Sequence, residues 1–132
     1  PWMCIKAAIE VMESMVAGGW PEIMERNRAL AREVRDFLAT AFSEQNGVSD
    51  SLLPSMVSFR LPDGKAEDLH LKLVDAGFEV PVMSWPPNIS PVSTVPGEES
   101  GRVLRVSCQL YNDFSDYERL LEVLPSLVDA PL

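Results

Sequence analysis

The fold is decided by residues 103–120, which read "VLRVSCQLYNDFSDYERL". Apolar and polar side chains alternate at the start of this stretch, and a period of two is typical of a β-strand with one buried face. We therefore predict a strand over 102–110, with Arg105 inside it and not at its end. The buried face is expected to carry Leu104, Val106, Cys108 and Leu110, and the other face Val103, Arg105, Ser107 and Gln109.

A helix is predicted directly after this strand. The segment "SDYE" at 115–118 has the spacing of a capping box, in which side chains accept hydrogen bonds from backbone N–H groups of the first turn. Four leucines then follow at helical spacing and define the apolar side of the helix, namely Leu120, Leu121, Leu124 and Leu127.

A strand, a helix and a second strand are predicted upstream of this unit. The strand over 55–62 alternates, the helix covers 64–77 and stops at Gly77, and the next strand covers 78–85. Pro81 cannot donate a hydrogen bond to a neighbouring strand, so the 78–85 strand is expected at an edge of the sheet. The residues expected to face the core are Val57, Phe59 and Leu61 on the strand, and Leu69, Leu73 and Ala76 on the helix.

Two helices are predicted at the N-terminus, over 2–17 and 21–43. The glycines of "GGW" at 18–20 end the first helix, and Pro21 fits the first turn of the second, where its missing N–H costs nothing. Glu22 and Arg26 form an i,i+4 ion pair. The apolar stripe of the second helix consists of Ile23, Leu30, Val34, Phe37, Leu38 and Ala41.

These elements predict an α+β fold: a long helix pair followed by β-α-β-β-α, with a small three-stranded sheet and helices on one face. The chain of 132 residues is one domain, with the helix pair in 1–45 and the sheet unit in 55–130. Residues 86–101 contain four prolines and no periodicity, and they form a loop between strands.

The first helix has more apolar surface than this domain is expected to cover. Its polar residues form one narrow stripe, and such a helix is usually buried on most sides. We expect a neighbouring domain or subunit to pack on Trp2, Met3, Ile5, Ile9 or Met12, and the alternative is that the second helix covers them. Because the chain begins at Pro1 and not at a methionine, we expect it to be part of a longer polypeptide.

Composition narrows the possible partners. A net charge of −9 without a basic patch disfavours nucleic acid, and no stretch has the roughly 20 apolar residues of a membrane-spanning helix. Cys4 and Cys108 lie in apolar surroundings and form no metal-binding spacing, so we expect two buried free thiols in a reducing, cytoplasmic environment. His70, beside Leu69, is expected on the flank of a helix and not in catalysis.

Arg105 is the candidate binding residue. An arginine on the solvent-exposed face of a sheet is commonly only hydrated. The spacing of the residues alone does not decide between this alternative and a binding role. A guanidinium held on a strand is, however, also well suited to bind a carboxylate through two parallel N–H···O bonds.

The motif around Arg105 resembles a known family. "LRVSCQLYNDFSDYERLLEVL" is similar to the C-terminal region of class V aminotransferase-fold enzymes in the isopenicillin N epimerase-like branch, where Arg-(Ile/Val)-Ser-x-Gln-x-Tyr-Asn precedes an acidic, leucine-rich helix. "PWMCIKAAIEVMESMVAGGWPEIMERNRALA" resembles the long helix pair of that branch, and "GFEVPVMSW" its second small-domain strand. The 86–101 loop is longer than the branch leads us to expect.

The resemblance implies a function for the whole protein. Such enzymes bind pyridoxal 5′-phosphate in a large domain, as a Schiff base with a lysine, and act as homodimers on amino acids as aminotransferases, epimerases or C–S lyases. An arginine of the small domain holds the substrate α-carboxylate, and Arg105 occupies that place. Supporting roles in substrate binding are implied for Ser107, Gln109, Tyr111 and Asn112.

The resemblance also implies that this chain is inactive alone. Its three lysines are Lys6, Lys65 and Lys72, and none has the sequence context of the cofactor lysine. We therefore expect no catalytic, cofactor-binding or metal-binding residue here, and expect the large domain of the same polypeptide to supply them. Two alternatives remain: a stand-alone α+β module that binds a small ligand or a partner, and a purely structural dimerisation domain.

Overall fold

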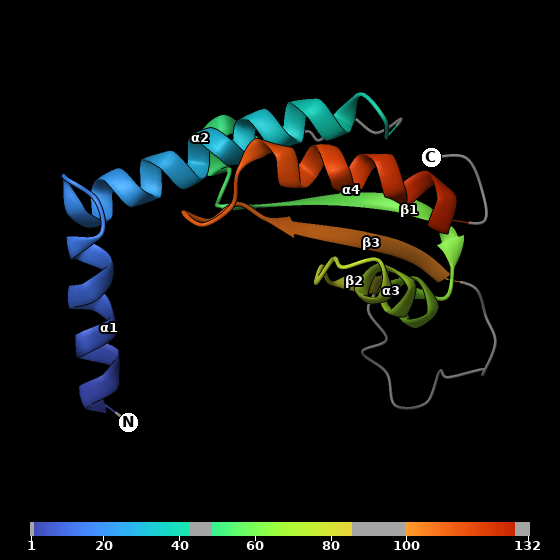
Figure 1. Cartoon of the computed structure of the whole chain (residues 1–132). Helices are drawn as coiled ribbons and strands as arrows, with labels where there is room; N and C mark the ends of the chain where they lie inside the picture. Colours follow the sequence, from blue (N-terminus) through green and yellow to red (C-terminus); the bar gives the residue numbers. More distant parts are fainter. Residues whose placement is uncertain (1, 43–48, 86–99, 129–132) are drawn as a thin grey trace.

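The computed structural model describes residues 2–42, 49–85 and 100–128 (Figure 1). Most of the predicted 86–101 loop lies outside the described residues, whereas Ser100 and Gly101 belong to a strand. The elements in chain order are α1 (Trp2–Ser14), α2 (Gly19–Ala39), the short 3-10 helix η1 (Asp50–Leu52), β1 (Met56–Gly64), α3 (Ala66–Asp75), β2 (Val82–Trp85), β3 (Ser100–Ser107) and α4 (Phe114–Leu127). Apart from η1, this is the predicted order.

The sheet has three antiparallel strands in the order β1-β3-β2. Phe59 lies opposite Leu104 and Val57 opposite Val106, so the apolar residues of β1 and β3 share one face. Ser58 lies opposite Arg105, which places Arg105 on the other face. β2 lies at an edge, as Pro81 predicts, but the segment 78–81 before it is not part of the strand.

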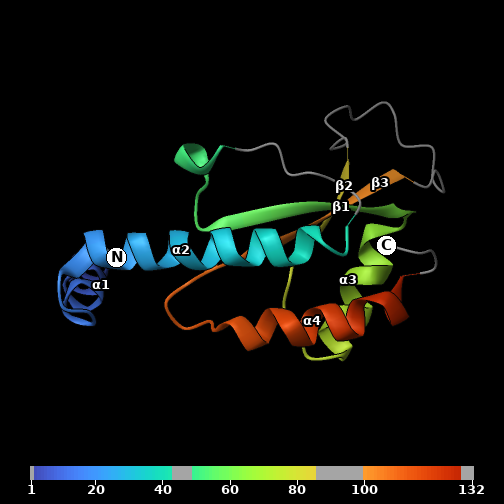
Figure 2. The same ribbon diagram turned by 90° about the horizontal axis from the view of Figure 1, so that it is seen from above.

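One apolar core fills the space between the sheet and three helices. The sheet contributes Phe59 and Leu104 to this core, and the ring of Phe59 stacks on that of Phe42 with 4.9 Å between their centroids. The helices contribute Ala31, Val34, Leu38, Leu69, Leu73, Leu120 and Leu124, all buried. Figure 2 shows α2, α3 and α4 on the same side of the sheet, which confirms the α+β fold with helices on one face.

Helix α1 projects from the end of α2, away from the sheet (Figure 1). Ile5 is 53% exposed and Ile9 41%, so the alternative in which α2 covers this face is wrong for the described chain. The prediction that Cys4 is buried is also wrong, because no described element covers α1 at that position. Cys108, by contrast, is buried in the core.

Three further local predictions are wrong. β3 ends at Ser107 and not at residue 110, because the chain turns with the Asn112 N–H donating to the Gln109 carbonyl at 2.9 Å. Ala76 is exposed, since it follows the last residue of α3. The capping box of α4 is formed by Asp113 and Asp116 and not by 115–118.

The geometry of the α4 cap explains this last difference. The carboxylate of Asp113 accepts from the Ser115 backbone N–H at 2.9 Å, and that of Asp116 accepts from the Asp113 N–H at 3.2 Å. The helix therefore begins at Phe114, one residue before the predicted box. No helix among the described residues is long and apolar enough to cross a membrane.

We expect Leu104→Ala to destabilise the fold strongly. Leu104 is fully buried in the centre of the sheet, and truncation of such a leucine costs about 2–5 kcal/mol through lost burial and the cavity left behind. Ile5→Ala, at an exposed position of α1, should change the free energy of unfolding by less than about 0.5 kcal/mol. Denaturant unfolding of both variants tests this, and equal losses would contradict the assigned core.

Candidate functional site

Arg105 lies on the central strand of the sheet, between β1 and the segment that leads into β2. It is opposite Ser58 of β1, and its own N–H donates to the Pro81 carbonyl at 3.1 Å. Its side chain is partly buried, and the Nε atom is shielded from solvent without a hydrogen-bond partner among the described residues. An unpartnered buried donor is rare in proteins and calls for an explanation, such as a functional role or a bound water or ion.

A cavity of about 710 Å³ opens beside this side chain, and we call it the Arg105 cavity. It lies between the segment that leads from α3 to β2 and the first turns of α4. Its walls are residues 76–81, Arg105 to Ser107 of β3, Tyr111, Asn112, Asp116, Tyr117, Arg119 and Leu120. Four of the five predicted binding residues, all except Gln109, therefore lie around one cavity.

The charges in this cavity are not equivalent. Arg119 and Asp116 form an ion pair at 2.6 Å. The hydrogen bond from the Asp113 N–H, aided by those from Arg119 and Asn112, holds the pKa of the Asp116 carboxyl below its usual range. Arg105 has no ion pair with a described residue, so it is the cation that remains to bind an anionic group.

Ser107 and Tyr111 fit the predicted site. Ser107 is exposed and lies two residues from Arg105 on the same face of β3, while its carbonyl accepts from the Tyr117 hydroxyl at 2.8 Å. Burial raises the pKa of Tyr117, which is therefore a structural hydroxyl. The ring of Tyr111 is 85% exposed at the mouth of the cavity, where it has room to contact a ligand.

Asn112 serves the turn after β3. Its Oδ1 accepts from the Gln109 N–H at 3.2 Å, and its Nδ2 donates to Asp116 at 3.5 Å. Because both ends of its amide are used in this way, Asn112 positions Asp116 and the start of α4.

Gln109 is not on the open face of the sheet as predicted. The strand has already ended at this position, and the side chain extends toward α2, where its Oε1 accepts from Asn27 Nδ2 at 3.0 Å. Its Nε2 donates to Ser55 Oγ at 3.2 Å. Gln109 therefore lines a different cavity, formed by α1, α2 and the turn after β3.

Asp116, Arg119 and Arg102 were not predicted from the sequence. The Asp113-x-x-Asp116 spacing was a usable signal for Asp116, since it is also a capping pattern. Arg102 is 3% exposed on the helix side of β3, and its Nε donates to the Pro62 carbonyl at 2.7 Å. A Cβ atom on Gly64 would lie 2.8 Å from the guanidinium carbon of Arg102, so glycine there leaves room for this buried arginine.

Among the described residues, the histidine and the lysines either make structural contacts or are exposed. His70 Nδ1 lies 3.0 Å from the Val80 carbonyl and tethers the segment that precedes β2. Lys6 pairs with Glu10 at 3.8 Å, Lys72 donates to the Leu127 carbonyl, and Lys65 is exposed before α3. None of the lysines lines the Arg105 cavity.

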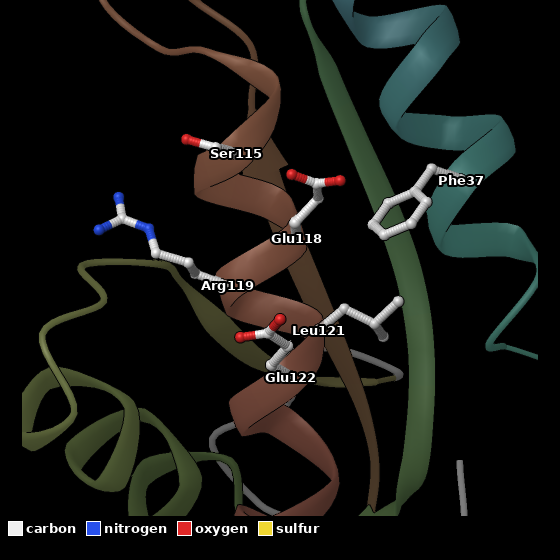
Figure 3. A pocket seen from close by; sticks show the side chains of 6 residues that line it. All are labelled: Phe37, Ser115, Glu118, Arg119, Leu121 and Glu122. Atoms are coloured by element: carbon white, nitrogen blue, oxygen red, sulfur yellow. The ribbon is translucent and has the colours of Figure 1, made fainter.

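A shallow depression on the outer side of α4 offers few groups that could bind a ligand specifically. Figure 3 shows Phe37 of α2 facing Leu121, with Glu118 and Glu122 beside them and Arg119 on the far side of α4 from Phe37. Glu118 and Glu122 are exposed acidic side chains beside this apolar contact. None of the polar residues that line the depression is buried. Arg119 also lines the Arg105 cavity, where it pairs with Asp116.

The chain matches no protein-family model, no curated protein and no solved structure in the comparisons made. The geometry around Arg105 and the sequence motif that contains it are therefore the grounds for a functional proposal.

Asp116 should make stability depend on pH in the acid range. Because its pKa is lowered in the folded chain, the unfolded chain binds the proton more readily, so the stabilisation is present above the ordinary value of 3.8 and is lost as pH falls below it. Asp116→Asn should flatten this part of the profile of unfolding free energy. Asp75→Asn, an exposed position at the end of α3 that takes no part in the α4 cap, is the matched control and should leave the contribution of the cap unchanged. Identical profiles for Asp116→Asn and wild type would contradict the assigned cap.

Proposed function

We propose that this chain is the substrate-carboxylate-binding small domain of a pyridoxal 5′-phosphate-dependent enzyme of the class V aminotransferase fold, in the isopenicillin N epimerase-like branch. The observation that carries the proposal is the buried, unpartnered Nε of Arg105 beside a cavity of about 710 Å³. The sequence resemblance places the carboxylate-binding arginine at this same residue. The whole protein would act on an amino acid by transamination, epimerisation or C–S bond cleavage.

Arg105 is suited to this role by rigidity and charge. A guanidinium offers two parallel N–H donors that match the two oxygens of a carboxylate, and a central strand holds such a group more firmly than a loop does. Asp116 and Arg119 neutralise each other at 2.6 Å, which leaves the charge of Arg105 for the ligand. Ser107 and Tyr111 would contact the bound substrate, and Asn112 would keep Asp116 in place.

The cofactor would be bound by the large domain, because the family resemblance implies this and no lysine lines the Arg105 cavity. No chemical step is therefore assigned to the chain itself. The open face of the sheet and the exposed apolar side of α1 would meet that domain of the same polypeptide. We propose a homodimeric enzyme, as the family resemblance implies, and a cytoplasmic one, in keeping with the free thiols of Cys4 and Cys108.

A second candidate is a stand-alone module that binds a small carboxylate without chemistry. It is supported by one observation: four of the candidate binding residues, Arg105, Ser107, Tyr111 and Asn112, line a single cavity. The two candidates differ in whether binding of the amino acid requires the large domain. The module should bind a free amino acid as the isolated 132-residue chain, whereas the small domain should bind it well only together with the large domain.

We expect Arg105→Ala in the full-length gene product to reduce kcat/KM for the amino-acid substrate strongly. Loss of one partner from a desolvated charge pair costs about 2–5 kcal/mol, because the carboxylate is left without its counter-charge. Arg105→Lys should restore part of the loss, since an ammonium group lacks the bidentate geometry. Steady-state kinetics with each variant measures this effect.

Arg60→Ala is the matched control. Arg60 lies on the same open face of β1, is 57% exposed and is 3.9 Å from Asp63. Its removal should change kcat/KM by no more than about twofold, because exposed ion pairs contribute about 0–1 kcal/mol. An unchanged kcat/KM in Arg105→Ala would contradict the carboxylate-binding role of Arg105. An equal loss in both variants would contradict it as well.

A further inference from the structure

The wall of the Arg105 cavity contains charged side chains of both signs. Two of them, Asp116 and Arg119, are joined in an ion pair at 2.6 Å. The other two, Arg105 and Glu79, line the same cavity and form no ion pair with each other or with any other described residue. The described part of the cavity therefore offers a ligand one cation and one anion that the fold leaves unpaired.

Glu79 lies in the segment that leads from α3 to β2. Its neighbours in sequence, Phe78 and Val80, pack against the apolar core, whereas Glu79 is exposed. This alternation places its carboxylate on the side away from the core, where the guanidinium of Arg105 also lies. The two unpaired charges are therefore accessible to the same ligand.

Hydrogen bonds fix the chain around Glu79. His70 Nδ1 lies 3.0 Å from the Val80 carbonyl, and the Arg105 N–H donates to the Pro81 carbonyl at 3.1 Å. Glu79 is two residues from Pro81, and two residues of chain span at most about 7 Å. The carboxylate is therefore held within a limited distance of the strand that carries the guanidinium.

The two charges indicate the chemical class of the substrate. In the function proposed above, Arg105 binds the α-carboxylate of an amino acid, and the α-amino group would react with the aldehyde of the cofactor. The α-amino group is then not free to pair with Glu79. The cation that pairs with Glu79 must therefore belong to the side chain of the substrate, and the four-carbon stem of a lysine spans a separation of this size.

We propose that Glu79 selects amino acids whose side chain ends in a cation, such as lysine or ornithine, while Arg105 holds their α-carboxylate. This inference rests on the function proposed above and adds the substrate class to it. Glu79 binds the side chain of the substrate and determines specificity, and it takes no part in the chemical step.

The test compares lysine with norleucine, which has the same straight side chain without the terminal ammonium group. Steady-state kinetics of the full-length gene product give kcat/KM for each amino acid, and the wild-type protein should prefer lysine. Glu79→Gln should lower the ratio of the two kcat/KM values about threefold or more, the effect of losing an ion pair at an exposed carboxylate. It should change kcat/KM for norleucine by less than about twofold, because norleucine does not pair with Glu79.

Two further variants sharpen the test. Glu118→Gln is the matched control, since Glu118 is an exposed carboxylate on the outer side of α4, outside the Arg105 cavity, and its removal should leave the ratio unchanged. Glu79→Lys reverses the charge and should make glutamate a better substrate than lysine. Because Glu79 is exposed, both of its variants are expected to fold.

The outcomes separate this inference from the proposed function. If Arg105→Ala lowers kcat/KM for both amino acids while Glu79→Gln leaves their ratio unchanged, the selection of cationic side chains is overturned and the carboxylate-binding role stands. Equal kcat/KM for lysine and norleucine in the wild-type protein would overturn the selection as well. An unchanged kcat/KM in Arg105→Ala would overturn both proposals.

Discussion

The pairing of β1 with β3 is the constraint on which the rest of the structure depends. With Phe59 opposite Leu104 and Val57 opposite Val106, every second residue of both strands enters the core. A slip of one residue would bring Arg105 into the core and expose Leu104, because successive side chains point to opposite faces. The register therefore fixes both the apolar core and the position of the guanidinium on the open face.

The open face keeps a group that the fold itself does not satisfy. A buried donor without a partner costs about 1–3 kcal/mol, and the Nε of Arg105 is in this condition among the described residues. The neighbouring charges do not relieve it, since Asp116 is already paired with Arg119 at 2.6 Å. A carboxylate ligand bound in the adjacent large cavity would offset this cost. This is the basis of the proposed function.

The sequence predicted the class of fold and most of the element order from periodicity alone. Buried alternation on β1 and β3 and leucine spacing on α4 were strong signals, because the core needs those residues in that order. The ends of elements were predicted less well: the strand around Arg105 stops at Ser107 because of hydrogen bonds in a turn that periodicity does not report. The exposure of Cys4 depends on where α1 projects, which is a tertiary property.

The candidate site was predictable in part for the same reason. Arg105 and Ser107 follow from strand alternation, and their face follows from the register. Gln109 was placed wrongly because its side chain bonds to Asn27, which is far away in the sequence. Asn27 itself has no local signal, since a single polar residue on a buried helix face becomes informative only when its neighbours in space are known.

The most direct test of the central claim is to read the coding sequence upstream of Pro1. If the chain is the small domain of a pyridoxal 5′-phosphate-dependent enzyme, this sequence encodes, in frame, a larger domain with a lysine in the context of a cofactor-binding lysine. A start codon or a signal-cleavage site immediately before Pro1 would contradict the account. In that case the carboxylate-binding module would be the better description of the protein.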